Sequence, residues 1–309
     1  MRVAITGATG FIGRRITSLL ESPQYLVRAL ARDAAAARSL LAPGVEIVPG
    51  DLATPQALRA LVRDADAVLH LAGAVRGATQ ADFDAANVDG SAAVLAAMDA
   101  AAPHARLLFF SSLAAREPAL SHYAGSKQRA EQLLLTRAAA RPVTILRPPA
   151  VYGPGDREML PVFRFMARTG RAPCAGKAAD RLSLIFVDDL AHAARAWLDA
   201  PALPTATWSL HDGHDGGYDW PLLCAIVGAA CGREIRAWEI PRAPLELIAR
   251  GNRALGRLLG RSPMLTPEKL RELRHPDWVC DNSAITAALH WTPRTQLAEG
   301  LRLTPGWHD

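Results

Sequence analysis

A tyrosine and a lysine four residues apart, Tyr123 and Lys127, are the side chains of this sequence whose types and spacing best suit proton transfer. They lie in the stretch SHYAGSKQRAEQ (121–132), which has a helical pattern, so both side chains are expected on one face of a helix. A tyrosine hydroxyl has an ordinary pKa of about 10, which is too high for efficient acid–base work near neutrality. A nearby ammonium favours the phenolate, and we therefore expect Lys127 to lower the pKa of Tyr123.

Three glycines near the start of the sequence predict a dinucleotide site. Gly7, Gly10 and Gly13 follow a short apolar run with the spacing G-x-x-G-x-x-G. The first glycine permits a tight turn, the second lets backbone N–H groups approach a pyrophosphate, and the third lets helix and strand pack closely. The helix that begins here points the positive end of its dipole at the phosphates. The residues of this turn that we expect to contact the dinucleotide are Gly7, Thr9, Gly10, Phe11, Ile12 and Gly13.

Strand-like apolar runs alternate with helical patterns through the first half of the chain. The runs lie at 3–6, 26–30, 45–48, 67–71, 107–111 and 143–146. This alternation predicts an α/β fold, a doubly wound parallel sheet (Rossmann) covered by helices on both faces. One helix is expected to begin with Thr54 as its N-cap and Pro55 at its first position.

The pattern becomes less regular after RPPAVYGPGD (147–156), where Pro and Gly are frequent and the elements shorten. We expect a dinucleotide-binding domain at 1–152 and a smaller portion, mostly substrate-binding, at 153–309. The strand at 182–190 and the helix that follows it, to about residue 200, are expected to rejoin the sheet of the first domain.

The composition is typical of a soluble globular protein. Half of the 309 residues are apolar and 21% are charged, which excludes disordered and fibrous classes. The four cysteines are too scattered for a disulfide framework or a zinc site. A first strand that begins at residue 2, and the lack of a long apolar stretch, lead us to expect a cytoplasmic protein without a membrane span.

The formal net charge of +5 is concentrated between Arg233 and Arg274. We attribute it to solvated arginines and expect no nucleic-acid partner. The segment 243–260 has apolar residues at helical spacing, with Arg250, Arg253 and Arg257 along another face. We interpret it as a helix on the substrate-binding portion, with an anion-binding wall, a membrane-surface face or a partner site as alternatives. The run HDGHD (211–215) is better explained by turn chemistry than by metal binding, and we expect no metal.

The order of short motifs along the chain resembles that of the extended short-chain dehydrogenases/reductases. The motifs are TGATGFIG (6–13), GDL (50–52), HLAG (70–73), NVDG (87–90), FFSS (109–112), YAGSK (123–127) and RPPAVYGPGD (147–156). The sequence looks like the branch with sugar-nucleotide epimerases, dihydroflavonol-type reductases and 3β-hydroxysteroid-type dehydrogenases. The resemblance implies an enzyme that transfers hydride between a nicotinamide and a carbonyl or secondary alcohol.

The resemblance also implies roles for single residues. Tyr123 is the acid/base, Lys127 holds the nicotinamide ribose, Ser112 binds the substrate oxygen and Asn87 helps to shape the active site. Taken singly, each has an ordinary structural explanation, such as a turn, a helix-end hydrogen bond, a core aromatic or, for Asp51, a helix cap. The implied cofactor contacts outside the glycine turn are Asp51, Leu52, Leu71, Ala72, Gly73, Tyr123, Lys127 and Pro148.

The end of the predicted second strand, YLVRALARD (25–33), bears on the choice of cofactor. Relatives that use NAD carry their acidic residue at the position of Ala31, and in this sequence Arg32 follows. An arginine here accommodates a 2′-phosphate, whereas Asp33 is the competing ligand of a free ribose. We favour Arg32, and therefore NADP(H) over NAD(H), because a guanidinium matches phosphate geometry.

Together these features predict an NADP-dependent oxidoreductase that acts on a small molecule. Ala150 replaces an Asn usual in sugar-nucleotide enzymes and Phe186 replaces a frequent His, which favours an apolar substrate. An NDP-sugar epimerase or dehydratase with tightly bound NAD(P) is the alternative. A non-catalytic dinucleotide-binding protein is a further one, and the intact Tyr123–Lys127 pair argues against it. The resemblance implies a homodimer packed through helices near 83–101 and 122–140, although monomers also occur.

Overall fold

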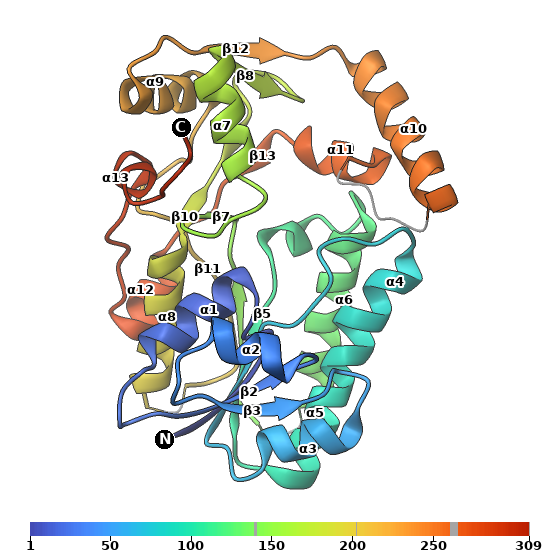
Figure 1. The fold of residues 1–309 in the computed structure, drawn as a ribbon, viewed down its shortest axis with the longest axis vertical. Coiled ribbons are helices and arrows are strands. Elements are labelled where there is room, and N and C mark those ends of the chain that lie inside the picture. The colour runs from blue at the N-terminus through green and yellow to red at the C-terminus, as the bar shows by residue number, and fades with distance from the viewer. Residues whose placement is uncertain (139–140, 202, 260–264, 309) are drawn as a thin grey trace.

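The centre of the fold is a seven-stranded sheet in which every pair of neighbouring strands is parallel (Figure 1). The computed structural model describes residues 1–138, 141–201, 203–259 and 265–308, with the backbone alone for 254–259. Across the sheet the strands are β11 (Ala206–Ser209), β6 (Val143–Arg147), β5 (Arg106–Phe110), β4 (Ala67–His70), β1 (Arg2–Thr6), β2 (Leu26–Ala31) and β3 (Glu46–Pro49). The chain order reverses between β4 and β1, and ligands of such sheets bind beyond the carboxyl ends of the strands at that point.

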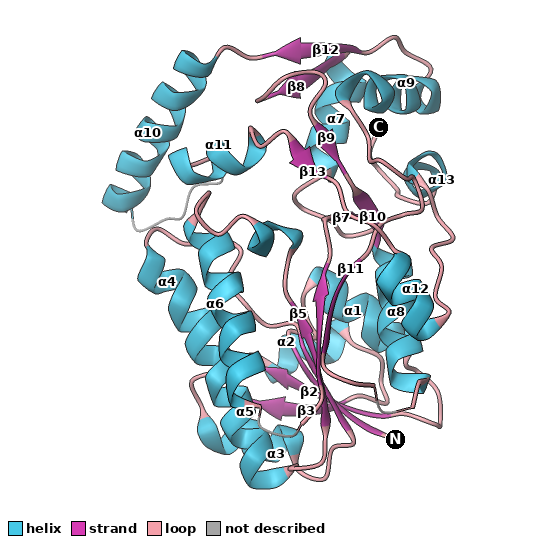
Figure 2. Cartoon of the chain, turned by 180° about the vertical axis from the view of Figure 1, so that it is seen from behind, coloured by secondary structure: helices cyan, strands magenta, loops and turns pink. Residues whose placement is uncertain are grey.

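Helices cover both faces of the sheet because alternate side chains of a buried strand point to opposite sides. In β1, Val3 and Ile5 belong to one hydrophobic cluster and Ala4 belongs to the other. The first cluster lies against α1 (Phe11–Leu19), α2 (Ala34–Leu40), α8 (Val187–Asp199) and α12 (Ser283–Leu289). The second lies against α3 (Pro55–Val62), α5 (Gly90–Ala101) and α6 (His122–Arg137), which Figure 2 shows together on one side.

The predicted doubly wound parallel sheet is confirmed. All six apolar runs of the first half are strands, β1 to β6, and differ from the prediction by one or two residues at their ends. Helix α3 begins at Pro55 with Thr54 as its N-cap, as predicted.

The C-terminal portion stands beyond the carboxyl edge of the sheet and has a core of its own (Figures 1 and 2). Tyr152, Phe163, Leu223 and Trp307 are among the large side chains of that core. Three two-stranded parallel pairs run through it: β7 (Ala150–Tyr152) with β10 (Leu184–Phe186), β8 (Arg171–Cys174) with β12 (Arg236–Glu239), and β9 (Arg181–Leu182) with β13 (Asp277–Trp278). Its helices are α7 (Leu160–Thr169), α9 (Trp220–Cys231), α10 (Arg242–Leu259), α11 (Pro267–Leu273) and α13 (Leu297–Arg302).

The expectation for the strand at 182–190 is wrong. Residues 184–186 of that segment form β10, which pairs with β7 outside the main sheet, and residues 187–190 already belong to α8, which does pack against α1 as expected. The seventh strand of the sheet is instead β11, from the short segment Ala206–Ser209 that follows a Pro-rich stretch. The chain turns away from the sheet after β6 and returns only with α8, so β10 has β7 as its neighbour.

Candidate active site

The glycine turn leaves room for a dinucleotide because side chains are excluded from it. A Cβ atom on Gly7, whose φ is +75°, would lie 2.6 Å from the backbone nitrogen of Ala72. A Cβ on Gly13 would lie 2.2 Å from the carbonyl oxygen of Gly7. Helix α1 starts with Gly10 as its N-cap and is without Asp or Glu in its first turn, so its first N–H groups are left for an anion. The turn therefore fits the diphosphate of a nicotinamide dinucleotide.

The other residues predicted in this turn lie around its rim. Thr9, Phe11 and Ile12 are partly buried at the start of α1. A Cβ on Gly155, in the loop after β7, would lie 3.8 Å from the Phe11 ring. The turn thus adjoins both the carboxyl edge of the sheet and the beginning of the C-terminal portion.

At the end of β2, Arg32 and Asp33 have different surroundings. The Asp33 carboxylate is the N-cap of α2 and accepts a 2.9 Å hydrogen bond from Ala36 N. The Arg32 side chain is exposed, and no hydrogen bond or ion pair is found for it within the described parts of the chain. The acidic group is thus engaged with its own helix, while the guanidinium is left for an anionic ligand.

The segments after β3 and β4 approach the same edge. Asp51 accepts hydrogen bonds from Ala53 N at 3.0 Å and from the Thr54 hydroxyl at 2.7 Å, so it braces the turn before α3. Leu52 packs beside Gly90, where a Cβ would lie 2.6 Å from its Cδ1. The structural explanation of Asp51 therefore holds, and its carboxylate still lies exposed at the edge of the sheet.

Three predicted residues from different elements meet after β4. A Cβ on Gly73 would lie 2.5 Å from Asn87 Oδ1 and 3.4 Å from Lys127 Nζ. Leu71 N donates a 3.1 Å hydrogen bond to the carbonyl oxygen of Thr6, which holds the HLAG segment against the glycine turn. The lack of a side chain at Gly73 therefore allows the segment after β4, Asn87 and Lys127 to come together.

Asn87 lies on a single π-helical turn, η1 (Ala85–Asp89), between α4 (Gln80–Asp84) and α5, and such turns are frequent at functional sites. Its Oδ1 accepts a 2.8 Å hydrogen bond from Ala74 N. Its Nδ2 donates to Ala74 O at 3.1 Å and to Ser126 Oγ at 2.8 Å. Asn87 is thus a buried clamp that joins the loop after β4 to helix α6.

Lys127 is almost completely buried, at 4% exposed, and is held at the carboxyl end of β5. Its Nζ donates a 2.9 Å hydrogen bond to the carbonyl oxygen of Phe110. Burial lowers the pKa of Lys127 to about 8, against the opposing effect of the Glu131 carboxylate. The lysine is therefore charged at neutral pH in a fixed place next to Gly73.

Tyr123 is half-buried one turn before Lys127 in α6, and its ring centroid lies 6.2 Å from that of Phe83. Burial raises the pKa of Tyr123 to about 12; the hydrogen bond with Ser112 works in the opposite direction, and the negative charges of Glu272 and Glu158 raise it further. The expectation that this pKa lies below its ordinary value is wrong for this structure, because burial has the largest effect on it and raises it. The phenol therefore carries its proton near neutrality.

The two serines after β5 have separate tasks. Ser111 is buried and its hydroxyl donates to Glu131. Ser112 is the N-cap of the 3₁₀ turn η2 (Leu113–Arg116), and its Oγ accepts a 3.2 Å hydrogen bond from Ala114 N. Ser112 is the serine that shares a hydrogen bond with Tyr123. Pro148 supports its turn by accepting a 2.9 Å hydrogen bond from Leu113 N.

A buried polar chain beneath the site was not found from the sequence. Ser91 donates to Asn87 O at 2.6 Å, so its oxygen accepts from Nε2 of His70 at 3.0 Å. The Nδ1 atom of His70 then accepts from Thr6 Oγ1 at 2.7 Å, and Thr6 in turn accepts from Ala72 N at 3.2 Å. Burial, with the charge of Lys127 second, lowers the pKa of His70 to about 3, so it stays neutral. This series of hydrogen bonds connects the glycine turn to the π-helical turn that carries Asn87.

Glu131 is a second buried residue that supports the site and was not predicted from the sequence. It is buried one turn after Lys127 and receives two hydrogen bonds from Arg147, at 2.9 and 2.5 Å, besides that of Ser111. The ends of β5 and β6 are thereby fixed to α6. The only sequence signal was its i+4 spacing from Lys127 on the same helix face.

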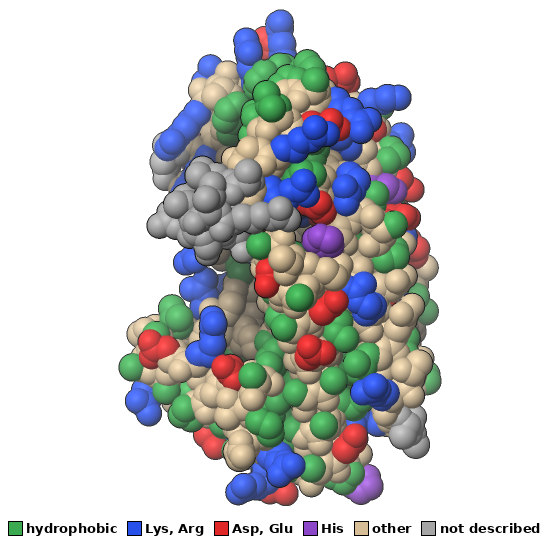
Figure 3. All heavy atoms as spheres, turned by 90° about the vertical axis from the view of Figure 1, so that its right-hand side faces the viewer, with side chains coloured by type: hydrophobic (Ala, Val, Ile, Leu, Met, Phe, Trp, Pro, Cys, Tyr) green, Lys and Arg blue, Asp and Glu red, His purple; other side chains and the backbone are tan. Residues whose placement is uncertain are grey.

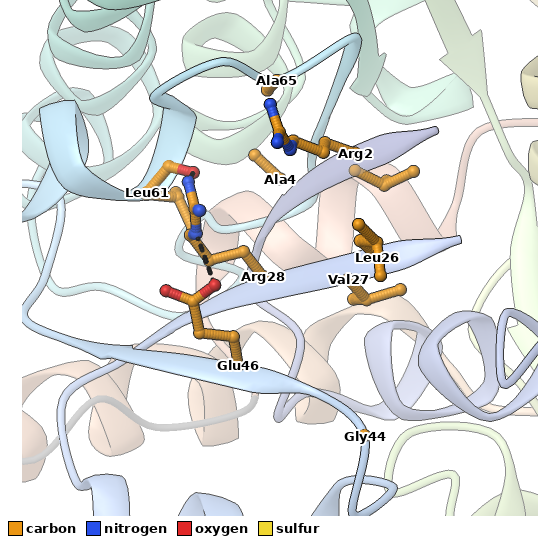
Figure 4. A pocket seen from close by; sticks show the side chains of 10 residues that line it. Arg2, Ala4, Leu26, Val27, Arg28, Gly44, Glu46, Leu61 and Ala65 are labelled. Atoms are coloured by element: carbon orange, nitrogen blue, oxygen red, sulfur yellow. Dashed lines mark hydrogen bonds and ion pairs between the residues drawn. The ribbon is translucent and has the colours of Figure 1, made fainter. Parts of the chain in front are cut away.

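The face seen in Figure 3 is hollowed between the sheet domain and the C-terminal portion. Helices α4 and α6 lie below this hollow, and α10 and α11 lie above it (Figure 1). At its edge the Ser121 hydroxyl donates to Glu272 of α11. A separate depression, at the amino-terminal ends of β1 and β2, is shown in Figure 4; it is lined by Arg28 and Glu46, whose ion pair measures 3.0 Å, and it contains none of the predicted site residues.

The fold and this edge define a dinucleotide-binding protein of the extended short-chain dehydrogenase/reductase type. The sequence model of the NAD dependent epimerase/dehydratase family matches residues 3–207, and the chain belongs to that family. It is an enzyme of the NAD(P)-dependent oxidoreductase class, as its relatives' names also indicate.

Two relatives and one solved structure illustrate the similarity. A ceramide reductase of Caulobacter vibrioides (strain NA1000 / CB15N) is 35% identical over 316 residues, which cover 99% of this chain and 94% of that protein. A 2-alkyl-3-oxoalkanoate reductase of Stenotrophomonas maltophilia (strain K279a) is 30% identical over 219 residues, 62% of this chain and 63% of the other. The structure of MoeE5 in complex with UDP-glucuronic acid and NAD has a TM-score of 0.76 at 21% identity, with 99% of this chain and 98% of that chain covered. The last similarity concerns the fold.

Proposed function

We propose that the protein is an NADP(H)-dependent reductase that converts a ketone of an apolar, lipid-like substrate into a secondary alcohol, with Tyr123 as the proton donor. The observation that carries the proposal is the position of Tyr123, which shares a hydrogen bond with Ser112 at the carboxyl edge of the sheet and lies one helical turn before Lys127 in the Gly73–Asn87–Lys127 contact. The Tyr123 phenol holds a proton that it can donate to a carbonyl oxygen, and burial makes it a weaker acid than an ordinary tyrosine.

The reaction divides between the cofactor and the side chains of this edge. When bound, the reduced nicotinamide supplies a hydride to the carbonyl carbon. The C=O double bond becomes a single bond, and the oxygen takes the proton of the Tyr123 hydroxyl, which leaves a phenolate that regains a proton from solvent. Ser112 donates a hydrogen bond to the same oxygen, and Lys127 is the residue that would hold the nicotinamide ribose.

Arg32 supports NADP(H) as the preferred cofactor. Its exposed guanidinium lies at the end of β2, where the adenosine ribose of such folds is bound, while Asp33 is engaged as the cap of α2. A bidentate arginine contact to a 2′-phosphate is a strong charge-assisted interaction.

Two kinds of observation support an apolar ketone. Phe186 is a buried core residue in an edge contact with Tyr152, 5.5 Å between ring centroids, so the position where sugar-nucleotide enzymes often have His is closed to polar recognition. Ala150 offers no side-chain hydrogen bond where those enzymes usually have Asn. The names of the two reductases also favour a ketone or oxo group on an alkyl-rich molecule.

We also propose a cytoplasmic homodimer packed through α5 and α6. Leu135 of α6 is exposed and would be covered in such a dimer. Residues 139–140, at the end of the second predicted interface segment, lie outside the described residues. Light scattering of the purified protein tests the dimer, and a monomer at all concentrations contradicts it.

The experiment that tests the function is a substrate panel. The loss of NADPH absorbance is followed with long-chain and short-chain 3-oxo esters and amides, and UDP-glucose and UDP-glucuronic acid are incubated in parallel with NAD or NADP. We expect NADPH consumption with the oxo compounds, faster with longer alkyl chains, and the secondary alcohol as product. Conversion of a nucleotide sugar with the cofactor returned unchanged, and no consumption with any ketone, contradicts the proposal.

A further inference from the structure

One segment of the C-terminal portion accounts for the whole net charge of the chain. Residues 233–274 contain ten Lys and Arg and five Asp and Glu, which gives +5. The rest of the chain holds 25 of the 35 basic and 25 of the 30 acidic residues and is therefore neutral. The segment includes β12, α10 and α11, which lie at the end of the molecule farthest from the N-terminus (Figure 1).

Helix α10 presents apolar side chains on two sides. Leu245 and Ala249 are buried, and the helix packs on α11. Leu247, on the opposite side of the helix, is 73% exposed, and Ile248 next to it is 52% exposed. An ordinary surface helix turns one apolar stripe to the core and polar residues to water. The exposed pair therefore points to a second apolar environment outside the described chain.

Two exposed arginines lie on another stripe of the same helix, and Arg250 is one turn from Leu247. The side chains of Arg242 and Arg250 are both about seven-tenths exposed and share one carboxylate, that of Glu246, at 2.5 and 3.8 Å. Such exposed ion pairs contribute little in water, so either guanidinium can exchange its partner for a phosphate. An amphipathic helix with arginines beside large aliphatic residues is the composition of helices that lie in a membrane interface.

The neighbouring strand repeats this combination. All four residues of β12 are exposed, and Trp238 within it is 41% exposed. The Arg171 guanidinium lies over the Trp238 ring, 5.6 Å from its centroid. Tryptophan is enriched where protein meets the headgroups of a bilayer. Figure 3 shows Lys and Arg side chains gathered with hydrophobic ones over this end of the molecule.

We propose that this end, which we call the basic tip and define by Arg171, Trp238, Arg242, Leu247, Ile248 and Arg250, docks on the surface of a bilayer that contains anionic lipid. Leu247 and Ile248 enter the boundary between headgroups and acyl chains, and the arginines bind lipid phosphates. The attachment is peripheral, since within the described residues none of the helices combines the length and apolar character needed to cross a bilayer. The positive charge favours an anionic surface over a second copy of the same tip, which would repel it.

The tip and the candidate active site are connected. Helix α10 packs on α11, and Glu272 of α11 accepts a hydrogen bond from Ser121, two residues before Tyr123. A molecule attached by its tip therefore holds the hollow between α6 and α11 close to the lipid surface. An apolar substrate dissolved in that bilayer would then lie only a short distance from the candidate active site. The docking itself requires only the tip and stands apart from the proposed reaction.

The test is vesicle flotation of the full chain with two compositions, phosphatidylcholine alone and phosphatidylcholine with phosphatidylglycerol. We expect binding to the anionic vesicles that weakens as salt is raised. The Leu247→Asp/Ile248→Asp variant should bind more than tenfold more weakly, because it removes the buried apolar area. Arg250→Glu should weaken binding by about fivefold or more, since each basic group near such a surface contributes roughly that factor.

Matched variants outside the tip keep the test specific. Leu303→Asp and Arg59→Glu alter a leucine that is 49% exposed and an exposed arginine elsewhere, and both should bind vesicles like the unaltered chain. Melting temperature and NADPH turnover on a water-soluble ketone should be unchanged in the tip variants. The proposal is overturned if the unaltered chain does not bind anionic vesicles, or if the control variants lose binding as much as the tip variants do. It is also overturned if the unaltered chain is an oligomer without lipid and Leu247→Asp/Ile248→Asp dissociates that oligomer. Should that double variant not fold, Arg250→Glu and the salt dependence decide.

Discussion

The hydroxyl of Ser121, the N-cap of α6, donates a hydrogen bond to Glu272 of α11, so the helix that carries Tyr123 meets the C-terminal portion two residues before the tyrosine. Glu272 is buried, and Lys269 Nζ lies 2.8 Å from its second carboxylate oxygen. Its negative charge also raises the pKa of Tyr123. The contact between Ser121 and Glu272 therefore links the packing of the C-terminal portion on α6 to the pKa of Tyr123.

Replacing Glu272 by Gln should make Tyr123 more acidic. Gln keeps an oxygen that accepts from Ser121 and nearly the same volume, but it removes the charge that raises the pKa of Tyr123. Reduction needs the protonated phenol, so the alkaline fall of kcat/KM should move to lower pH. Glu158→Gln removes a charge with a smaller effect and should move it less, and Glu299→Gln should leave it in place. An alkaline limb that stays put or moves upward in Glu272→Gln would contradict this reading.

Arg32 should determine the choice of nicotinamide cofactor. Loss of one charge-assisted phosphate contact, worth about 1.5–3 kcal/mol, should raise the Kd for NADPH roughly 10- to 100-fold in Arg32→Ala. The Kd for NADH should change little, and isothermal titration measures both. Asp33→Asn is the matched variant, because Asn retains the cap of α2 while removing the charge. If Asp33→Asn weakens NADH while Arg32→Ala affects both cofactors equally, Asp33 is the ribose ligand.

A methyl group in the glycine turn should abolish dinucleotide binding. In Gly13→Ala the new Cβ would meet the Gly7 carbonyl at 2.2 Å and Ala8 Cα at 2.7 Å, so α1 must move away from the turn. We expect a loss of stability of about 1–3 kcal/mol from overpacking, together with the loss of NADPH binding. Gly44→Ala is the control, because no heavy atom lies within 4 Å of its Cβ position and its φ is ordinary. It should bind normally and gain about 0.4–1 kcal/mol from a stiffer unfolded chain.

The buried lysine should make stability depend on pH. The pKa of Lys127 is lowered from 10.5 to about 8, so between these values the unfolded chain holds a proton that the folded chain has released. This contribution is therefore present at high pH and is lost as pH falls through about 8. Between pH 7 and pH 9 the unaltered protein should gain about 1 kcal/mol relative to Lys127→Met, measured by urea unfolding. Lys177→Met, which alters an exposed lysine, should show the unaltered pH dependence, and an identical slope in all three proteins would contradict the burial argument.

The parts of the fold that were predictable are those encoded locally. Strands β1 to β6 are continuous apolar runs, and the start of α3 is marked by Thr54 and Pro55 side by side in the sequence. The glycine turn was predictable for the same reason, since Gly7, Gly10 and Gly13 act within one turn. Strand β11 was missed because its four residues carry no strong apolar pattern and its partner β6 lies about sixty residues earlier.

The supporting groups of the candidate site depend on contacts between distant segments. Thr6, His70 and Ser91 come from β1, β4 and α5, and only the strand order of the sheet brings them into one hydrogen-bonded chain. Glu272 lies 151 residues after Ser121. The acidity of Tyr123 was misjudged because the sequence shows the nearby Lys127 but not the burial, which has the largest effect on the pKa of the phenol.

The most direct test of the account is Tyr123→Phe, measured for turnover and for NADPH binding in the same preparation. Phe keeps the ring beside Phe83 and removes only the hydroxyl that donates the proton. We predict that kcat with a reducible ketone falls by about 10²–10⁴-fold, the usual contribution of a general acid, while the Kd for NADPH stays within about twofold. Turnover equal to that of the unaltered protein would contradict the assignment of Tyr123.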